Sequence, residues 1–88
     1  MKKLFLSKKL RFRLESVGEE SIVFCYDERI NEYFAMDAKY YAALSMLEEG
    51  SSESELRSRC DGVNTDLLLR GLRYRRLLVE TGEGLGSD

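Results

Sequence analysis

The chain has 88 residues, of which 43% are apolar, and its formal net charge is −2. This length and composition predict one small globular domain with a single core, and the charge argues weakly against nucleic acid as the main partner. Histidine is absent, and the two cysteines, Cys25 and Cys60, have no further ligand at metal-binding spacing. We therefore expect free thiols, no metal and no cofactor, and a protein that is not an enzyme.

The chain begins with a basic segment whose apolar run, Leu4 to Leu6, ends after three residues where lysines return. A signal peptide needs a longer apolar run, and no stretch of the chain approaches the roughly 18 apolar residues of a membrane span. These features predict a cytoplasmic protein with no membrane partner, in which residues 1–9 are a lead-in to the domain.

A two-residue period characterises the first part of the chain. Leu10, Phe12 and Leu14 alternate with charged residues, which predicts a half-buried strand. The chain then has a turn at 17–20, a β-branched and aromatic strand at 21–26, a turn at 27–31 and a third strand at 32–36. These elements predict a three-stranded antiparallel meander.

The period changes to 3.6 residues after Asp37, whose carboxylate is suited to cap a helix N-terminus. The first predicted helix has an apolar face and ends at Gly50; the face comprises Tyr40, Ala43, Leu44 and Leu47. A second helix begins at a capping box formed by Ser52 and Glu55 and extends to about Cys60, before Gly62.

A third helix begins at Asn64 or Thr65. Its apolar face comprises Leu67, Leu68, Leu69 and Leu72 and continues through Leu77 and Leu78. Residues 81–88 are glycine-rich and predict a flexible tail. The whole chain, 1–88, is thus predicted to be a single α+β domain of the winged helix-turn-helix type, a three-stranded antiparallel β-meander followed by three α-helices.

The third strand is an edge strand in such a meander, and an extended peptide can add to it as a further strand. Side chains of the third helix are candidates for the wall of an adjacent groove: Leu67, Leu68, Gly71, Tyr74 and Arg75. Glycine inside a helix costs about 1 kcal/mol relative to alanine. Close approach of a bound backbone at Gly71 and a tight contact with the first helix are both open explanations.

Four arginines, Arg70, Arg73, Arg75 and Arg76, lie on the third helix without forming one continuous stripe. Three interpretations stay open for them: a solvated helix face, a patch that attracts an acidic peptide, and a patch that holds phosphates.

The ordered set of features over residues 10–80 resembles the PqqD-like domains, also called RiPP recognition elements, which bind precursors of ribosomally synthesised and modified peptides. The strongest similarity is the segment Tyr26 to Asp37, which resembles the second hairpin of that family. The helical segments with Glu48-Glu49-Gly50, with Ser52 to Leu56 and with Leu68 to Leu78 resemble its three helices. Family members usually have glycine near position 76, so Arg76 predicts that the third helix continues or ends differently here.

The resemblance implies a non-catalytic adaptor for natural product biosynthesis, which captures a precursor leader peptide by strand addition and delivers it to a modifying enzyme. That enzyme is a radical SAM enzyme, a leader peptidase and cyclase, or a cyclodehydratase. The peptide-binding residues it implies on the strand are Glu32, Tyr33, Phe34, Ala35, Met36 and Asp37, and those on the helix are Leu67, Leu68, Gly71, Tyr74 and Arg75. Arg70 and Arg73 are expected to steer an acidic leader.

Two other functions stay open at this point. A winged helix transcriptional regulator would place a helix in the major groove of DNA, although the net negative charge and the absence of an obvious basic wing disfavour it. An interaction subunit would form a homodimer through the same edge strand, and this can coexist with peptide binding.

Overall fold

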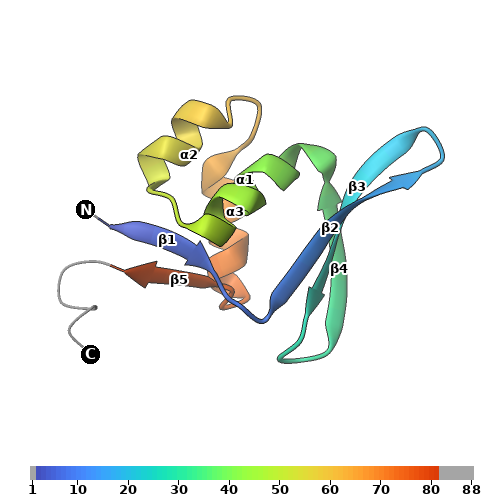
Figure 1. Ribbon diagram of the computed structural model, residues 1–88, viewed down its shortest axis with the longest axis horizontal. Coiled ribbons are helices and arrows are strands. Elements are labelled where there is room, and N and C mark those ends of the chain that lie inside the picture. The colour runs from blue at the N-terminus through green and yellow to red at the C-terminus, as the bar shows by residue number, and fades with distance from the viewer. Residues whose placement is uncertain (1, 82–88) are drawn as a thin grey trace.

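The computed structural model describes residues 2–81, which form an α+β structure with a three-stranded antiparallel sheet, three α-helices and a second, two-stranded sheet (Figure 1). In chain order the elements are β1 (Lys3–Leu6), β2 (Leu10–Val17), β3 (Glu20–Asp27), β4 (Glu32–Asp37), the 3₁₀ helix η1 (Ala38–Tyr40), α1 (Tyr41–Glu49), α2 (Glu53–Arg59), α3 (Thr65–Tyr74) and β5 (Leu78–Thr81). The predicted meander of three strands is confirmed as β2-β3-β4, and its three following helices are confirmed as well.

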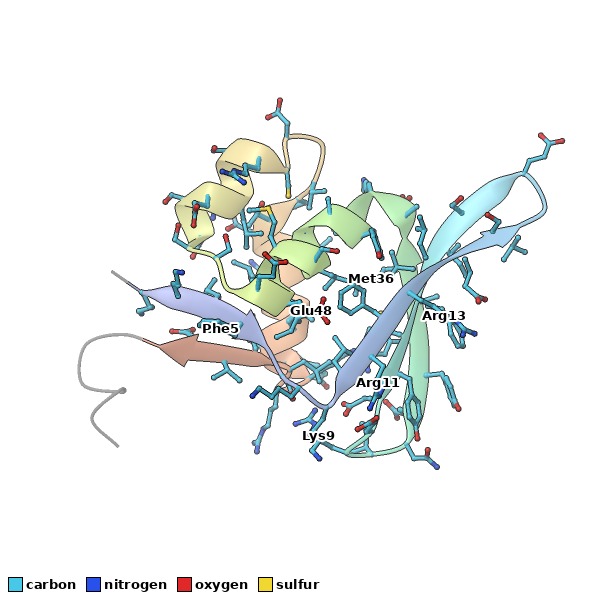
Figure 2. All side chains as sticks on the ribbon, in the orientation of Figure 1. Phe5, Lys9, Arg11, Arg13, Met36 and Glu48 are labelled. Carbon is cyan, nitrogen blue, oxygen red and sulfur yellow. The ribbon has the colours of Figure 1, made fainter. Side chains whose placement is uncertain are left out.

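Alternation along the strands gives the sheet an inner and an outer face. The inner face packs on the core and includes Val23 and Cys25 of β3, which are opposite Met36 and Phe34 of β4. Met36 lies between the sheet and the helices, whereas the Arg13 side chain points away from them (Figure 2). The outer face of the sheet is the side that points away from the core. It carries Arg11, Arg13, Ile22, Phe24, Tyr26, Tyr33 and Ala35.

The predicted N-caps are confirmed. The Asp37 carboxylate accepts a hydrogen bond from the backbone N–H of Lys39 at 3.0 Å, although the first turn is 3₁₀ and α1 begins only at Tyr41. Ser52 and Glu55 form the capping box of α2. Of the two candidates for the cap of α3, Asn64 provides it, since its side chain accepts from the N–H of Leu67 at 3.0 Å.

The end of α3 differs from the prediction, because Leu77 and Leu78 do not continue its apolar face. The helix ends at Tyr74, and Arg76 has the left-handed φ of 61°. The N–H of Arg76 bonds the carbonyl of Arg73 at 3.0 Å, and the N–H of Leu77 bonds that of Leu72 at 2.8 Å. This is the Schellman arrangement, in which glycine usually occupies the left-handed position. Arg76 therefore ends the helix in the conformation that a glycine would adopt.

The lead-in predicted for residues 1–9 is wrong for Lys3–Leu6, which form β1. This strand pairs with β5 in an antiparallel two-stranded sheet, and Leu4 also bridges to Ser51. Leu4 and Leu6 are buried in the core. The apolar run from Leu4 to Leu6 is too short for its pattern to predict a strand, and the partner strand lies near the other end of the chain. Thr81, assigned to the tail, belongs to β5, and the remaining tail residues 82–88 lie outside the described part.

The core lies between the inner face and the helices. Its fully buried leucines come from every helix and from the segment after α3: Leu44, Leu47, Leu56, Leu69, Leu72 and Leu77. Both cysteines are buried free thiols, and burial raises the pKa of Cys25 to about 11 despite the nearby positive charge of Arg75. Within residues 2–81, no helix is long and apolar enough to cross a membrane.

Candidate functional site

A groove runs between β4 and α3, and we call it the β4–α3 groove. Its volume is about 190 Å³, and its lining residues are Phe34, Met36, Tyr40, Leu67, Leu68, Gly71, Leu72 and Arg75. Within residues 2–81, β4 pairs only with β3, so its other edge is open beside this groove. An edge strand leaves alternate backbone N–H and C=O groups without a partner strand. The site thus combines a hydrogen-bonding edge with an apolar hollow.

The period of the sequence determines which β4 side chains enter the groove. Phe34 and Met36 are partly buried and line it, whereas Tyr33 and Ala35 point to the outer face. Tyr40 enters the same hollow from the 3₁₀ turn that directly follows the strand. The short connection through Asp37 therefore brings residues of strand and turn to one wall.

Gly71 lies on the α3 wall of the groove. A Cβ atom built at this position would meet nothing within 4 Å among the described residues. The tight contact with the first helix, one of the two explanations open from the sequence, is therefore wrong. The glycine widens the groove, because any other residue would direct a side chain into it or toward its mouth.

Arg75 lies at one end of the groove, just after the last helical residue of α3. Its guanidinium carbon is 4.0 Å from the centroid of the Phe34 ring, and its Nη1 is 3.4 Å from Oε1 of Glu32. A guanidinium over an aromatic face is a favourable cation–π arrangement. Arg75 thus provides positive charge at the groove end while its side chain stays fixed on β4.

The relative position of β4 and α3 is fixed by an ion pair that the sequence interpretation missed. Asp27 is fully buried at the end of β3, and its Oδ2 is 2.8 Å from Nη2 of Arg29. Arg29 also donates to the carbonyl oxygens of Arg75 and Arg76, at 3.0 Å for the second. The hydrogen bond and charge of Arg29 hold the pKa of Asp27 below its usual value, against the opposing effect of burial. The only local signal was an aspartate followed two positions later by arginine in a predicted turn.

The predicted site residues fall into three groups. Six line the β4–α3 groove: Phe34, Met36, Leu67, Leu68, Gly71 and Arg75. Glu32 and the 90% exposed Tyr74 instead line an adjoining hollow of about 380 Å³, together with Arg29, Ile30, Arg75 and Arg76. Tyr33 and Ala35 lie on the outer face, and Asp37 caps the following turn.

The two arginines expected to steer a peptide differ in their surroundings. Arg73 pairs with Glu80 of β5 at 3.1 Å and does not line the groove. Arg70 is exposed and also lies outside the lining. Two lining residues, Tyr40 and Leu72, were assigned to apolar helix faces by the sequence and not to the site. Their periodicity does not distinguish a residue that fills the core from one at the core's margin.

The groove's size and composition limit its chemistry. It is smaller than the roughly 300–1,000 Å³ of typical small-molecule pockets, and Arg75 is its only charged lining residue. Among residues 2–81, no three His, Cys, Asp or Glu side chains are grouped as metal ligands. The arrangement fits one or two apolar side chains of an extended segment.

Comparison with family models, with curated proteins and with solved structures returned no match for this chain. The resemblance to PqqD-like domains and the winged helix type accordingly stay predictions from the sequence.

Proposed function

We propose that this protein is a non-catalytic adaptor that binds an extended peptide by adding it to β4 as a further strand. The observation that carries the proposal is the open edge of β4 directly beside the apolar β4–α3 groove. Strand addition supplies backbone hydrogen bonds that are independent of sequence, and the groove supplies side-chain selectivity. Every second side chain of the added strand would face Phe34, Met36, Leu68 and the open space at Gly71.

The more specific role is capture of a precursor leader peptide and its delivery to a modifying enzyme. This part rests on the resemblance to PqqD-like domains, which bind leaders at the corresponding strand and helix. An adaptor of this kind raises the effective concentration of substrate at the enzyme without performing the chemistry. Arg75 at the groove end, although paired with Glu32, and the exposed Arg70 outside the groove would favour leaders with acidic residues.

The proposal is tested by backbone amide NMR of the labelled protein, titrated with leader peptides encoded by neighbouring reading frames and, separately, with duplex DNA. Peptide binding should shift the amides of Glu32 to Asp37 and of Leu67 to Arg75. Shifts on the arginine-bearing face of α3 that appear only with DNA would contradict the proposal and support the winged helix regulator.

Two substitutions of Gly71 separate binding from folding. Gly71→Leu should fill the groove and weaken peptide binding at least tenfold, since the new side chain occupies the space of a peptide side chain. Gly71→Ala is the matched control, because its Cβ meets no described atom within 4 Å and alanine favours the helix by about 1 kcal/mol. Equal binding by both variants would show that the groove is not the site.

Salt dependence gives a second distinction between peptide and nucleic acid. Two arginines at the end of α3 already pair with acids: Arg73 in the last turn with Glu80, and Arg75 just after the helix with Glu32. Apolar anchoring in the groove should persist as salt is raised, whereas DNA binding falls steeply because counterions are released from phosphates.

A further inference from the structure

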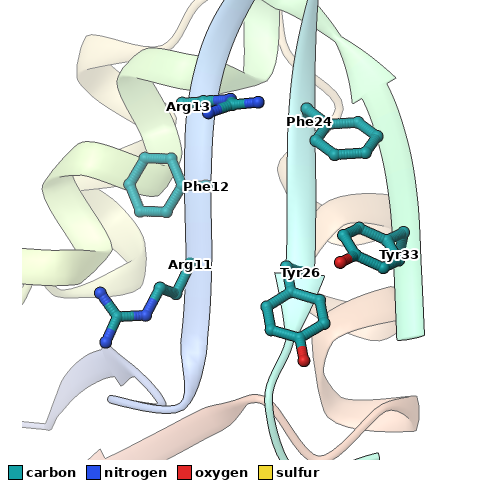
Figure 3. Close-up of a pocket in the computed structure, with 6 residues that line it drawn as sticks. All are labelled: Arg11, Phe12, Arg13, Phe24, Tyr26 and Tyr33. Atoms are coloured by element: carbon teal, nitrogen blue, oxygen red, sulfur yellow. The ribbon is translucent and has the colours of Figure 1, made fainter. Parts of the chain in front are cut away.

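The outer face carries an aromatic cluster that the β4–α3 groove does not use. Tyr33 of β4 lies against two aromatic rings of β3, with ring centroids 5.5 Å from Phe24 and 4.6 Å from Tyr26. Arg11 and Arg13 of β2 border the cluster, and together with Phe12 these residues line an open hollow of about 430 Å³ (Figure 3). In residues 2–81, the helices lie on the other face of this sheet (Figure 1).

The cluster reaches the open edge of the sheet at Tyr33 and Ala35. Tyr33 keeps 62% of its surface exposed although its ring contacts two others. Ala35 is the next outward residue along β4 and is opposite Phe24. Ala35 is exposed, and because alanine has only a methyl group, its side chain does not separate the ring of Tyr33 from an added strand.

A strand added to β4 presents side chains to both faces of the sheet in alternation. If two of its residues, i and i+2, enter the groove, residue i+1 lies on the outer face beside Tyr33 and Ala35. Directly opposite residues on neighbouring strands have Cβ atoms about 5 Å apart, and diagonal neighbours are within reach of aromatic side chains. The side chain at i+1 can therefore extend across Ala35 toward the rings of Tyr33 and Phe24.

We propose that the outer face is a second specificity site for the same peptide, and that it selects an aromatic residue between the two apolar residues bound in the groove. This inference rests on the proposed function, and it defines the ligand as a strand with large apolar side chains on both faces. Aromatic rings near one another prefer stacked or edge-to-face contacts, which add to the effect of burial. On the β2 side of the cluster, the guanidinium carbon of the exposed Arg13 is 6.0 Å from the Phe24 centroid and stabilises that ring.

Charge makes a nucleic acid a poorer occupant of this face. Arg11 pairs with Glu28, and Arg13 pairs with Glu15 at 2.8 Å, so the local arginine charge is matched by carboxylates. Nucleic acid binding depends on unneutralised lysine and arginine that replace counterions at phosphates. The aromatic surface itself, beside an open strand edge, fits an apolar ring on a peptide better.

The probe is a displayed library of short random peptides, selected on the full chain and, in parallel, on Tyr33→Ala and Val17→Ala. Val17 is the matched control, because it is 58% exposed on the same face at the far end of β2. Peptides enriched on the unchanged protein and on Val17→Ala should carry apolar residues at i and i+2 and an aromatic residue at i+1. On Tyr33→Ala the preference at i+1 should disappear while that at i and i+2 remains.

One enriched peptide is then measured with its i+1 residue replaced by alanine. This change should weaken binding to the unchanged protein about tenfold and should have little effect on binding to Tyr33→Ala. Enriched peptides with apolar residues at i and i+2 but no preference at i+1 would overturn this inference and leave the proposed function standing. A selection that enriches no peptide over an unrelated control protein would overturn the proposed function and this inference with it.

Discussion

At the scale of single residues, the buried Asp27 holds two distant parts of the fold together through Arg29. It is buried, and its pair with Arg29 joins the β3–β4 turn to the last carbonyl groups after α3. A buried carboxylate is stable only when its hydrogen bonds are satisfied. Arg29 provides these bonds and, at the same time, sets the distance between the two walls of the β4–α3 groove.

Substitution Asp27→Asn should lower the free energy of unfolding at neutral pH by roughly 2 kcal/mol, because a charge-assisted hydrogen bond is lost. The pKa of Asp27 is lower in the folded than in the unfolded state. The ionised side chain therefore stabilises the fold fully above the unfolded-state pKa of about 3.9, and this stabilisation is lost as the pH falls through the folded-state pKa. The variant should therefore lose less stability than the unchanged protein between about pH 5 and pH 2.

Urea denaturation across this pH range measures the effect, with Asp61→Asn as a control at an exposed carboxylate. Every variant should still lose some stability at low pH, because hydrogen bonding to Arg73 also lowers the pKa of Glu80. Parallel pH profiles for Asp27→Asn and Asp61→Asn would refute the role of the buried pair.

At the scale of elements, the end of α3 determines the open end of the groove. Arg76 adopts a left-handed conformation that L-residues with a Cβ rarely take, and Leu77 then turns back into the core. Two features offset this strain: the buried Leu77 packs in the core, and Arg29 donates to the carbonyl of Arg76. The helix therefore ends as it would with glycine in the left-handed position, although the residue is arginine.

Substitution Arg76→Gly should raise the free energy of unfolding by about 1 kcal/mol, because glycine adopts this φ without steric strain. The matched control is Arg76→Ala, which also removes the side-chain charge but keeps the Cβ. Thermal or urea unfolding of the two variants measures the difference. If alanine and glycine have the same effect, the backbone at position 76 is not strained.

At the scale of the whole molecule, the two ends of the described chain meet. β1 pairs with β5, and Leu4 also bridges to Ser51 after α1 (Figure 1). This small sheet covers the helices on the side away from the β4–α3 groove, which remains open. A domain of this size has a total stability of roughly 5–15 kcal/mol, so a loss of a few kcal/mol in the packing of β1 would be a large fraction of the total.

Substitution Leu4→Ala should destabilise the fold by about 2–4 kcal/mol, since it leaves a cavity under β1. The rate at which the two buried cysteines are alkylated measures this loss, because alkylation requires a thiol that is exposed and ionised. The variant should be labelled about thirtyfold faster or more under native conditions. Leu14→Ala, at a leucine that is 49% exposed, is the control and should be labelled at the rate of the unchanged protein. Equal labelling of the two variants would mean that β1 is not needed for the stability of the core.

Local patterns predicted most of the elements. The alternation at Leu10, Phe12 and Leu14, the cap at Asp37 and the capping box of Ser52 with Glu55 all depend on residues close together in the chain. Six of the predicted site residues also line the groove, because the edge position of β4 follows from the order of strands in a meander. What such patterns missed were β1 and its partner strand β5.

The amino-acid sequence by itself thus determined the strands of the meander and the helix N-termini, since these depend on periods and caps within a few residues. Only the tertiary structure decided that Arg29 joins Asp27 to the end of α3, that Arg76 stops this helix and that Gly71 faces open space. These features depend on contacts between segments distant in the chain. Their geometry is set by the packing of sheet against helix, which no local pattern encodes.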